Sequence, residues 1–215
     1  MTRICTFIAL LTSLSVGCDS RASEAIDESI EPPLTYSIKV GDKTATLSEG
    51  ETVQLDGTFA NPTITVTAQP HRVFPYQGVT FEYPRSFTFE ADLEDRNAKN
   101  WTLSGNDLKI MYFVLNVSLS TDDFANNMID QFGRENATVV NANATITLGK
   151  QKLAGTSLRV TLASHTMVMD IYRIPSRGTQ TKLLVLQDSL DDSGNRSKES
   201  KRILAEIQSS FTIER

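Results

Sequence analysis

Hydrophobic and polar residues alternate in short runs between residues 34 and 70. The stretch from Tyr36 to Val40 alternates apolar with polar side chains, which is the period of a half-buried strand. Gly41-Asp42 follows as a turn, and such turn signals recur about every ten residues. Further short strands are predicted at 45–47, 53–55 and 64–66. We therefore predict a β-meander extension over residues 34–70, too poor in apolar residues to fold without a larger domain.

Longer apolar runs predict a main domain over residues 71–215. Val79, Phe81 and Tyr83 alternate with polar residues and predict a strand that Pro84 ends. The run LKIMYFVLNV at 108–117 is apolar on both faces in its middle, which is typical of a central strand covered on both sides. Further strands are predicted at 145–148, 158–162, 167–174, 183–186 and 211–213.

Two segments change to the period of a helix. In STDDFANNMIDQF, residues 120–132, the apolar side chains form one helix face. Ser120 or Thr121 can cap its start, Asp122 and Asp123 suit the positive end of its dipole, and Gly133 ends it. A second helix is predicted over 197–209, with Ile203, Leu204 and Ile207 inward. The whole pattern predicts an α+β fold, an antiparallel β-sheet flanked by helices.

Residues 1–17 have the regions of a bacterial signal peptide. Arg3 supplies positive charge, and residues 4–14 are mostly apolar but too short to span a bilayer. The small residues at 15–17 precede Cys18 and resemble the bacterial lipobox, in which the cysteine is lipidated and becomes the mature N-terminus. The lipobox leucine usually stands where this chain has Ser15; here it is Leu14. The resemblance implies a lipid on Cys18 and a place on an envelope membrane, facing the periplasm or the exterior; a plain secretory signal is the alternative.

Residues 18–33 predict a flexible tether between that anchor and the domain. After Cys18 the segment reads DSRASEAIDESIEPP, which is polar, acidic and ends in Pro-Pro. It has no periodic apolar face to bury. We therefore expect its removal to leave the melting temperature of the domain nearly unchanged.

Several stretches of the main domain resemble the PsbP-like α/β/α sandwich family. They are GVTFEYPRSFTF, the helix STDDFANNMIDQF after an apolar strand, KLAGTSLRV with its central Gly155, MDIYRI with KLLVLQD, and ILAEIQSSFTI. The resemblance covers residues 73–213, and the family includes a lumenal photosystem II subunit and a Ran-binding nuclear-import factor. It implies a sandwich domain that binds partners, and it brings no catalytic residues.

Charge and cysteine content exclude several functions. The formal net charge is -5 and the pI about 5.1, without the clustered Lys and Arg that phosphate binding requires, so no nucleic-acid partner is predicted. Both cysteines, Cys5 and Cys18, precede the folded part, which therefore has no disulfide and no thiolate metal site. A glycine-rich phosphate loop is absent, and no cofactor is predicted.

Candidate chemistry is sparse. Of the two histidines, His165 follows Ser164 at an apparent hairpin bend, and His71 follows Pro70 at the start of the main domain; neither predicts a catalytic triad. The loop DSLDDSGN offers a loose cation site made of Asp188, Asp191 and Asp192. An EF-hand is rejected, because serines would stand at its first and last ligand positions.

Two functions follow as hypotheses. The favoured one is a binding or scaffold lipoprotein that holds a protein partner near a membrane, without catalysis. The alternative is an envelope hydrolase that uses Asp or His in a cleft between the β-extension and the main domain. A shallow surface with an apolar patch would favour the first hypothesis, and a deep polar pocket would favour the second.

Overall fold

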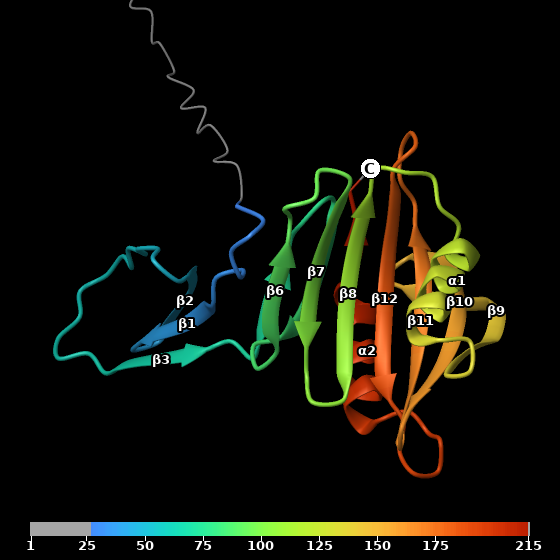
Figure 1. Cartoon of the computed structure of the whole chain (residues 1–215). Helices are drawn as coiled ribbons and strands as arrows, with labels where there is room; N and C mark the ends of the chain where they lie inside the picture. Colours follow the sequence, from blue (N-terminus) through green and yellow to red (C-terminus); the bar gives the residue numbers. More distant parts are fainter. Residues whose placement is uncertain (1–26, 215) are drawn as a thin grey trace, which may run out of the picture.

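The computed structural model describes residues 27–214, in which a seven-stranded antiparallel sheet forms the centre of the molecule (Figure 1). Its strands are consecutive hairpins apart from one crossover, which places β12 between β8 and β11. In spatial order they are β6 (Thr88–Asp92), β7 (Ala98–Ser104), β8 (Leu108–Leu115), β12 (Thr181–Ser189), β11 (His165–Ile174), β10 (Gln151–Leu162) and β9 (Ala137–Leu148).

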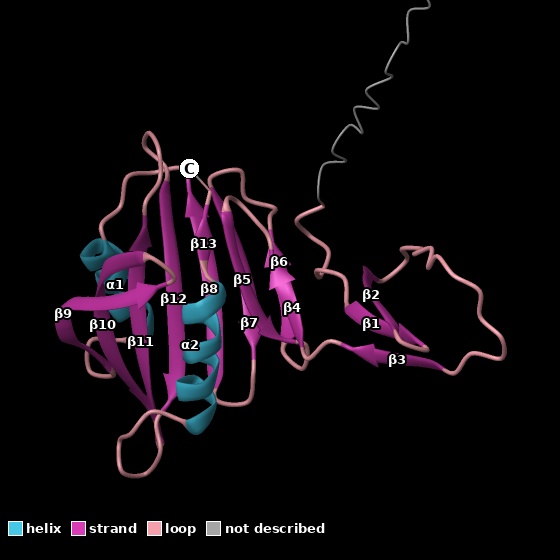
Figure 2. Ribbon diagram, turned by 180° about the vertical axis from the view of Figure 1, so that it is seen from behind, coloured by secondary structure: helices cyan, strands magenta, loops and turns pink. Residues whose placement is uncertain are grey.

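Two smaller antiparallel sheets complete the strands of the described residues. One consists of β2 (Lys43–Ser48), β1 (Thr35–Val40) and β3 (Ile64–Ala68), and it stands beside the β6 edge of the large sheet (Figures 1 and 2). The other consists of β13 (Thr212–Ile213), β5 (Val79–Pro84) and β4 (His71–Phe74). The last strand, β13, therefore pairs with β5, the second strand after the N-terminal sheet.

The two helices of the described residues begin and end close to where their patterns predict. Helix α1 (Thr121–Phe132) has Ser120 as its N-cap, with a reciprocal capping box to Asp123, and Gly133 as its C-cap. The hydroxyl and backbone N–H of Ser120 hold the pKa of Asp123 below its usual range. Helix α2 (Lys198–Ser210) is capped by Ser197, and it buries Ile203 and Ile207 as expected.

Each face of the large sheet is covered differently. Helix α1 packs on one face, where Phe124, Ala125 and Ile129 meet the inward residues of β10, β11 and β12 (Figure 1). On the opposite face, α2 lies beside strands β4, β5 and β13 (Figure 2). The core there is aromatic, and its rings include Phe74, Tyr76, Phe81, Trp101, Tyr112 and Phe211. Strand β8 contributes to both faces, so the prediction of a central strand covered on both sides is confirmed.

The predicted fold class is wrong. Half of the described residues are strand and 13% are helix, so the fold is β-rich rather than an α+β sheet with flanking helical layers. The prediction failed because the strand at 79–83 does not join the large sheet. As β5, it pairs with β4 and β13 and forms a second β-layer next to α2, in a place where the α/β/α sandwich expects helix.

The β-extension differs from its prediction in one strand. Residues 35–40, 43–48 and 64–68 pair as β1, β2 and β3, but the strand expected at 53–55 is part of a long loop over 49–63. Val53 in this loop is exposed. Turn residues bracket the run as they would a strand, yet in the described part of the chain no neighbouring strand pairs with it.

Candidate functional site

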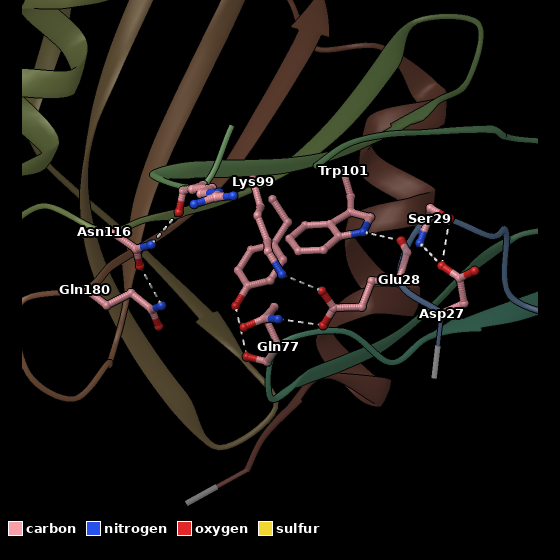
Figure 3. A network of polar contacts seen from close by, with 10 residues as sticks. Asp27, Glu28, Ser29, Gln77, Lys99, Trp101, Asn116 and Gln180 are labelled. Carbon is pink, nitrogen blue, oxygen red and sulfur yellow. Dashed lines mark hydrogen bonds and ion pairs between the residues drawn. The ribbon is translucent and has the colours of Figure 1, made fainter. Parts of the chain in front are cut away.

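Residues Asp27–Pro33, which we call the strap, lie against the main domain (Figure 3). The backbone carbonyl oxygen of Glu28 accepts a 2.8 Å hydrogen bond from Nε1 of Trp101. The carboxylate of Glu28 accepts bonds from Nζ of Lys99 at 3.0 Å and from Nε2 of Gln77 at 2.5 Å. Because the Trp101 indole is fully buried, its N–H needs an acceptor within the protein, and the strap supplies it.

The next strap carbonyls are held in the same way. The carbonyl oxygen of Ile30 accepts a 2.5 Å bond from the hydroxyl of Tyr76. That of Pro32 accepts from the guanidinium of Arg72, which also forms an ion pair of 3.1 Å with Glu31. The strap is therefore fixed through the backbone carbonyls of alternate residues.

The pKa values of side chains next to the strap reflect its packing against the domain. Burial, followed by the carboxylates of Asp27, Glu28 and Glu31, raises the pKa of Tyr76 to about 12. On the other side of the Tyr76–Gly78 loop, Nζ of Lys182 donates a 2.6 Å bond to the carbonyl oxygen of Gln77, and burial lowers the pKa of Lys182. The loop that receives the strap is thus itself held by the large sheet.

The last seven residues of the predicted tether are therefore docked on the domain. Residue 27 is the first that the structure describes, so residues 18–26 of the tether and the proposed lipidation site, Cys18, lie outside the described residues. The strap joins that part of the chain to the three-stranded sheet, since β1 begins at Thr35.

The three-stranded sheet has one apolar and one polar face. Because residues directly opposite in antiparallel strands point to the same side, its register places Tyr36 with Leu47 and Ala68, and Ile38 with Ala45 and Val66. The other side carries mostly Thr and Ser: Thr35, Ser37, Lys39, Thr44, Thr46, Ser48, Thr65 and Thr67.

The apolar face, defined as Tyr36, Ile38, Ala45, Leu47, Val66 and Ala68, is left partly open. The exposed fraction of Val66 is 58%, and Tyr36, Ile38 and Leu47 are half-buried. A hollow of about 240 Å³ lies over it, lined by Tyr36, Ile38, Leu47, Val66 and the turn Ser48–Glu51. Both hydrophobic cores of the described residues lie elsewhere, so this face is not part of the domain interior.

A second polar cluster lies under the start of α2. Asp170 of β11 and Asp188 of β12 are both buried, and Arg196 reaches them from the loop before the helix. Its guanidinium binds the carboxylate of Asp170, which also accepts a 2.6 Å bond from Ser157, and lies 3.9 Å from that of Asp188. This cluster neutralises one of two buried carboxylates, and it has the form of a structural ion pair.

The predicted cation site is not assembled. Asp188 faces Arg196 in the interior, whereas Asp191 accepts bonds from the backbone N–H groups of Ser193 and Asn195 in the exposed loop, which lowers its pKa. Asp192 is exposed. Among residues 27–214, no group of three His, Cys, Asp or Glu side chains is placed to hold a metal ion.

The two histidines have different surroundings. His165 is exposed at the start of β11, as its position in the sequence suggested. His71 lines a pocket of about 250 Å³ at the junction of the extension and the main domain, together with Thr35, Gln69 and Glu82. Its Nε2 lies 3.2 Å from Oε2 of Glu206 on α2.

Sequence reasoning missed the strap and the buried cluster. The strap has no apolar period, and it binds through carbonyl oxygens that every residue possesses. For the cluster a signal was present, because an acid inside an apolar strand, as in MDIYRI, indicates a buried partner.

Across residues 27–214, no helix is both long and apolar enough to cross a membrane. No protein-family model matches the chain, and no curated protein is similar to it in sequence.

Proposed function

We propose that the protein is a lipid-anchored lipoprotein of the bacterial cell envelope, whose extension binds a protein partner near the membrane without catalysis. The observation that carries the proposal is the open apolar face of the three-stranded sheet. Soluble domains seldom leave the apolar side of a sheet uncovered, and such a patch is typical of an interaction site.

The strap supports the membrane part of the proposal. A lipid on Cys18 would be joined to Asp27 by eight residues, 19–26, which reach at most about 30 Å when fully extended. Since residues 27–33 are bound to the domain, they cannot extend and so cannot lengthen the tether further. The domain would therefore be held close to the bilayer, and β1, which starts soon after the strap, would be held there with it.

The anchor is tested on the native protein. We expect its intact mass to correspond to a chain that begins at Cys18 and carries lipid, and we expect the protein in the membrane fraction. A Cys18→Ser variant should lose the added mass and leave that fraction. An unmodified Cys18 in a chain cleaved elsewhere would overturn the proposal.

Partner binding is tested by site-specific photo-crosslinking in the intact envelope. A photoreactive phenylalanine at position 66 would lie on the apolar face, whereas one at position 65 on the same strand would lie on the polar face. We expect a discrete protein adduct from position 66 and none from position 65. Equal labelling from both positions, or none from either, would count against a binding role for this face.

The alternative of an envelope hydrolase rests on the pocket that contains His71. Its ring faces the carboxylate of Glu206, as the base of a catalytic triad faces the acid that orients it. A nucleophile is also needed, and in the described residues no Ser or Thr hydroxyl hydrogen-bonds to His71. We therefore favour the binding function; hydrolysis of a general ester substrate that a His71→Ala variant loses would reverse this preference.

A further inference from the structure

We propose that the apolar face takes an extended protein segment that places a large apolar side chain in the hollow and a Lys or Arg next to Glu49 and Glu51. The inference rests on the proposed function and names the chemistry of the partner. The hollow is lined almost entirely by apolar groups, and Glu49 and Glu51 belong to the turn that closes one end of it.

The charges around the hollow are of one sign. Between residues 34 and 70 the acids are Asp42, Glu49, Glu51 and Asp56, and the bases are Lys39 and Lys43. Lys39 lies on the polar face, opposite Thr44 and Thr65. Lys43 is held at the far end of the sheet, where its Nζ donates to the carbonyl oxygen of Asp56 and lies 5.9 Å from the centre of the Phe59 ring.

Lys39 is thus on the other side of the sheet. Lys43, which the register places on the apolar side opposite Val40, is held by Asp56 at the end far from Glu49 and Glu51, so the acidic end of the hollow is uncompensated. An apolar surface with an acidic border is repelled by anionic lipid headgroups, because like charges are brought together as the surface approaches. The same border attracts a basic side chain on a protein segment. This charge pattern favours a basic, apolar protein segment over the bilayer as the occupant.

The geometry of the sheet suits an extended ligand. In the order β2-β1-β3, the two outer strands have no further neighbour among the described residues, so their outer N–H and C=O groups are open to another strand. Val66 and Ile64 of β3 are 58% and 61% exposed, so apolar side chains continue to that edge.

The test measures binding of fluorescent heptapeptides to the purified native protein by anisotropy. The first probe alternates Val with Thr and ends in two lysines, the second ends in two glutamates, and the third replaces each Val by Ser. We expect the lysine probe to bind about tenfold more tightly than the glutamate probe at low salt, with a smaller difference at high salt. The serine probe should not bind measurably.

Variants localise the site. Val66→Thr should weaken the lysine probe about fivefold, since it replaces a methyl by a hydroxyl in the contact. The combined Glu49→Gln and Glu51→Gln variant should abolish the preference for lysine over glutamate. It should still fold, because a glutamine at position 51 retains an oxygen that can accept the bond from the backbone N–H of Ser48. Thr65→Ser, on the polar face, is the matched control and should leave binding unchanged.

Outcomes separate this inference from the proposed function. A crosslink at position 66 together with equal binding of lysine and glutamate probes would overturn the partner chemistry alone. Binding to phosphatidylcholine vesicles in place of the peptides, lost in Val66→Thr, would identify lipid as the occupant and overturn it as well. Absence of both crosslink and peptide binding would overturn both proposals.

Discussion

Nε1 of Trp101 donates its hydrogen bond to the carbonyl oxygen of Glu28, 73 residues earlier in the chain. This bond joins the central aromatic core to a segment that carries no apolar pattern. It makes the strap part of the folded domain, and it provides a spectroscopic probe, because Trp101 is the single tryptophan.

Removal of the strap should therefore destabilise the domain, which replaces the expectation, drawn from the sequence pattern, that the whole tether can be removed without effect. A form that begins at Leu34 loses the acceptors of Trp101, Tyr76 and Arg72. At about 1 kcal/mol for each lost bond, and more where a charge is involved, we expect a loss on the order of 2–4 kcal/mol. Tryptophan emission should shift to the red. The measurement is chemical unfolding followed by fluorescence.

A form that begins at Asp27 is the control, and it should match the full chain in both stability and emission. Glu28→Ala should cost only about 1–2 kcal/mol, because it keeps the backbone carbonyl and removes the ion pair to the partly exposed Lys99 and the bond from Gln77. If the forms that begin at 27 and 34 unfold alike, the strap does not contribute to the fold.

Alkaline pH should unfold the protein through its buried tyrosines. Burial raises the pKa of Tyr76 and Tyr172 to about 12 and raises those of Tyr83 and Tyr112 as well. A raised pKa means that the folded state holds the proton more tightly than the unfolded state does. The resulting stabilisation is complete below the ordinary tyrosine pKa of 10.0 and is lost as the pH rises above it.

We expect tyrosinate absorbance in an alkaline titration to rise steeply, together with the loss of circular dichroism. Tyr76→Phe should reduce the slope of stability against pH in this range, and it should also lower stability at neutral pH, because its hydroxyl binds Ile30. Gradual ionisation of all tyrosines in a folded protein would contradict the prediction.

Replacing Arg196 should be among the costliest single changes near α2. Arg196→Met leaves the buried Asp170 and Asp188 without their cation. Removing one partner from a buried pair costs about 3–5 kcal/mol, and the partly exposed Arg196 should fall at the lower end. Thermal unfolding gives the measurement.

Two further variants show whether the stability lost in Arg196→Met comes from the buried aspartates. Adding Asp188→Asn to Arg196→Met should restore part of the stability, because one buried charge is then gone. Arg202→Met removes an exposed pair with Glu206 on the same helix and should cost only about 0.5 kcal/mol. A loss of the same size in both arginine variants would mean that burial of the aspartates is unimportant.

The sequence predicts local structure here better than it predicts pairing. A cap at Ser120 or Thr121, a helix that starts near Ser197 and the inward face of α2 all follow from short-range patterns, and the structure has Ser120 and Ser197 as the N-caps. Phe81 and Tyr83 likewise mark a strand, but alternation does not say which strand lies beside it, and the pairing of β5 with β4 and β13 decides the fold class.

The residues of the buried cluster and of the strap could not be predicted from the sequence for a related reason. Proximity in sequence predicts that Asp188 acts with Asp191 and Asp192, yet Asp188 lies near the end of a buried strand and faces Arg196, whereas Asp191 accepts the hydrogen bonds that order the loop. Glu28 gave no signal at all, since its main contact is a backbone carbonyl. The apolar face is the exception: its alternation is legible in the sequence, and only its lack of a cover required the structure.

A close backbone contact at Gly149 provides the last prediction. Gly149 lies in the turn of the β9–β10 hairpin with a φ of +55°, and a Cβ there would lie 2.2 Å from the carbonyl oxygen of Phe211. Gly178, in the β11–β12 loop, has a φ of +68° and nothing within 4 Å of such a Cβ. Gly149→Ala and Gly178→Ala therefore share the cost of a left-handed alanine, about 1–2 kcal/mol. Gly149→Ala must also push away the segment that joins α2 to β13, so its total loss should exceed that of Gly178→Ala by about 1–3 kcal/mol. Urea unfolding of the two variants measures the difference directly. Equal losses would mean that the hairpin and the C-terminal segment do not meet as closely as the structure places them.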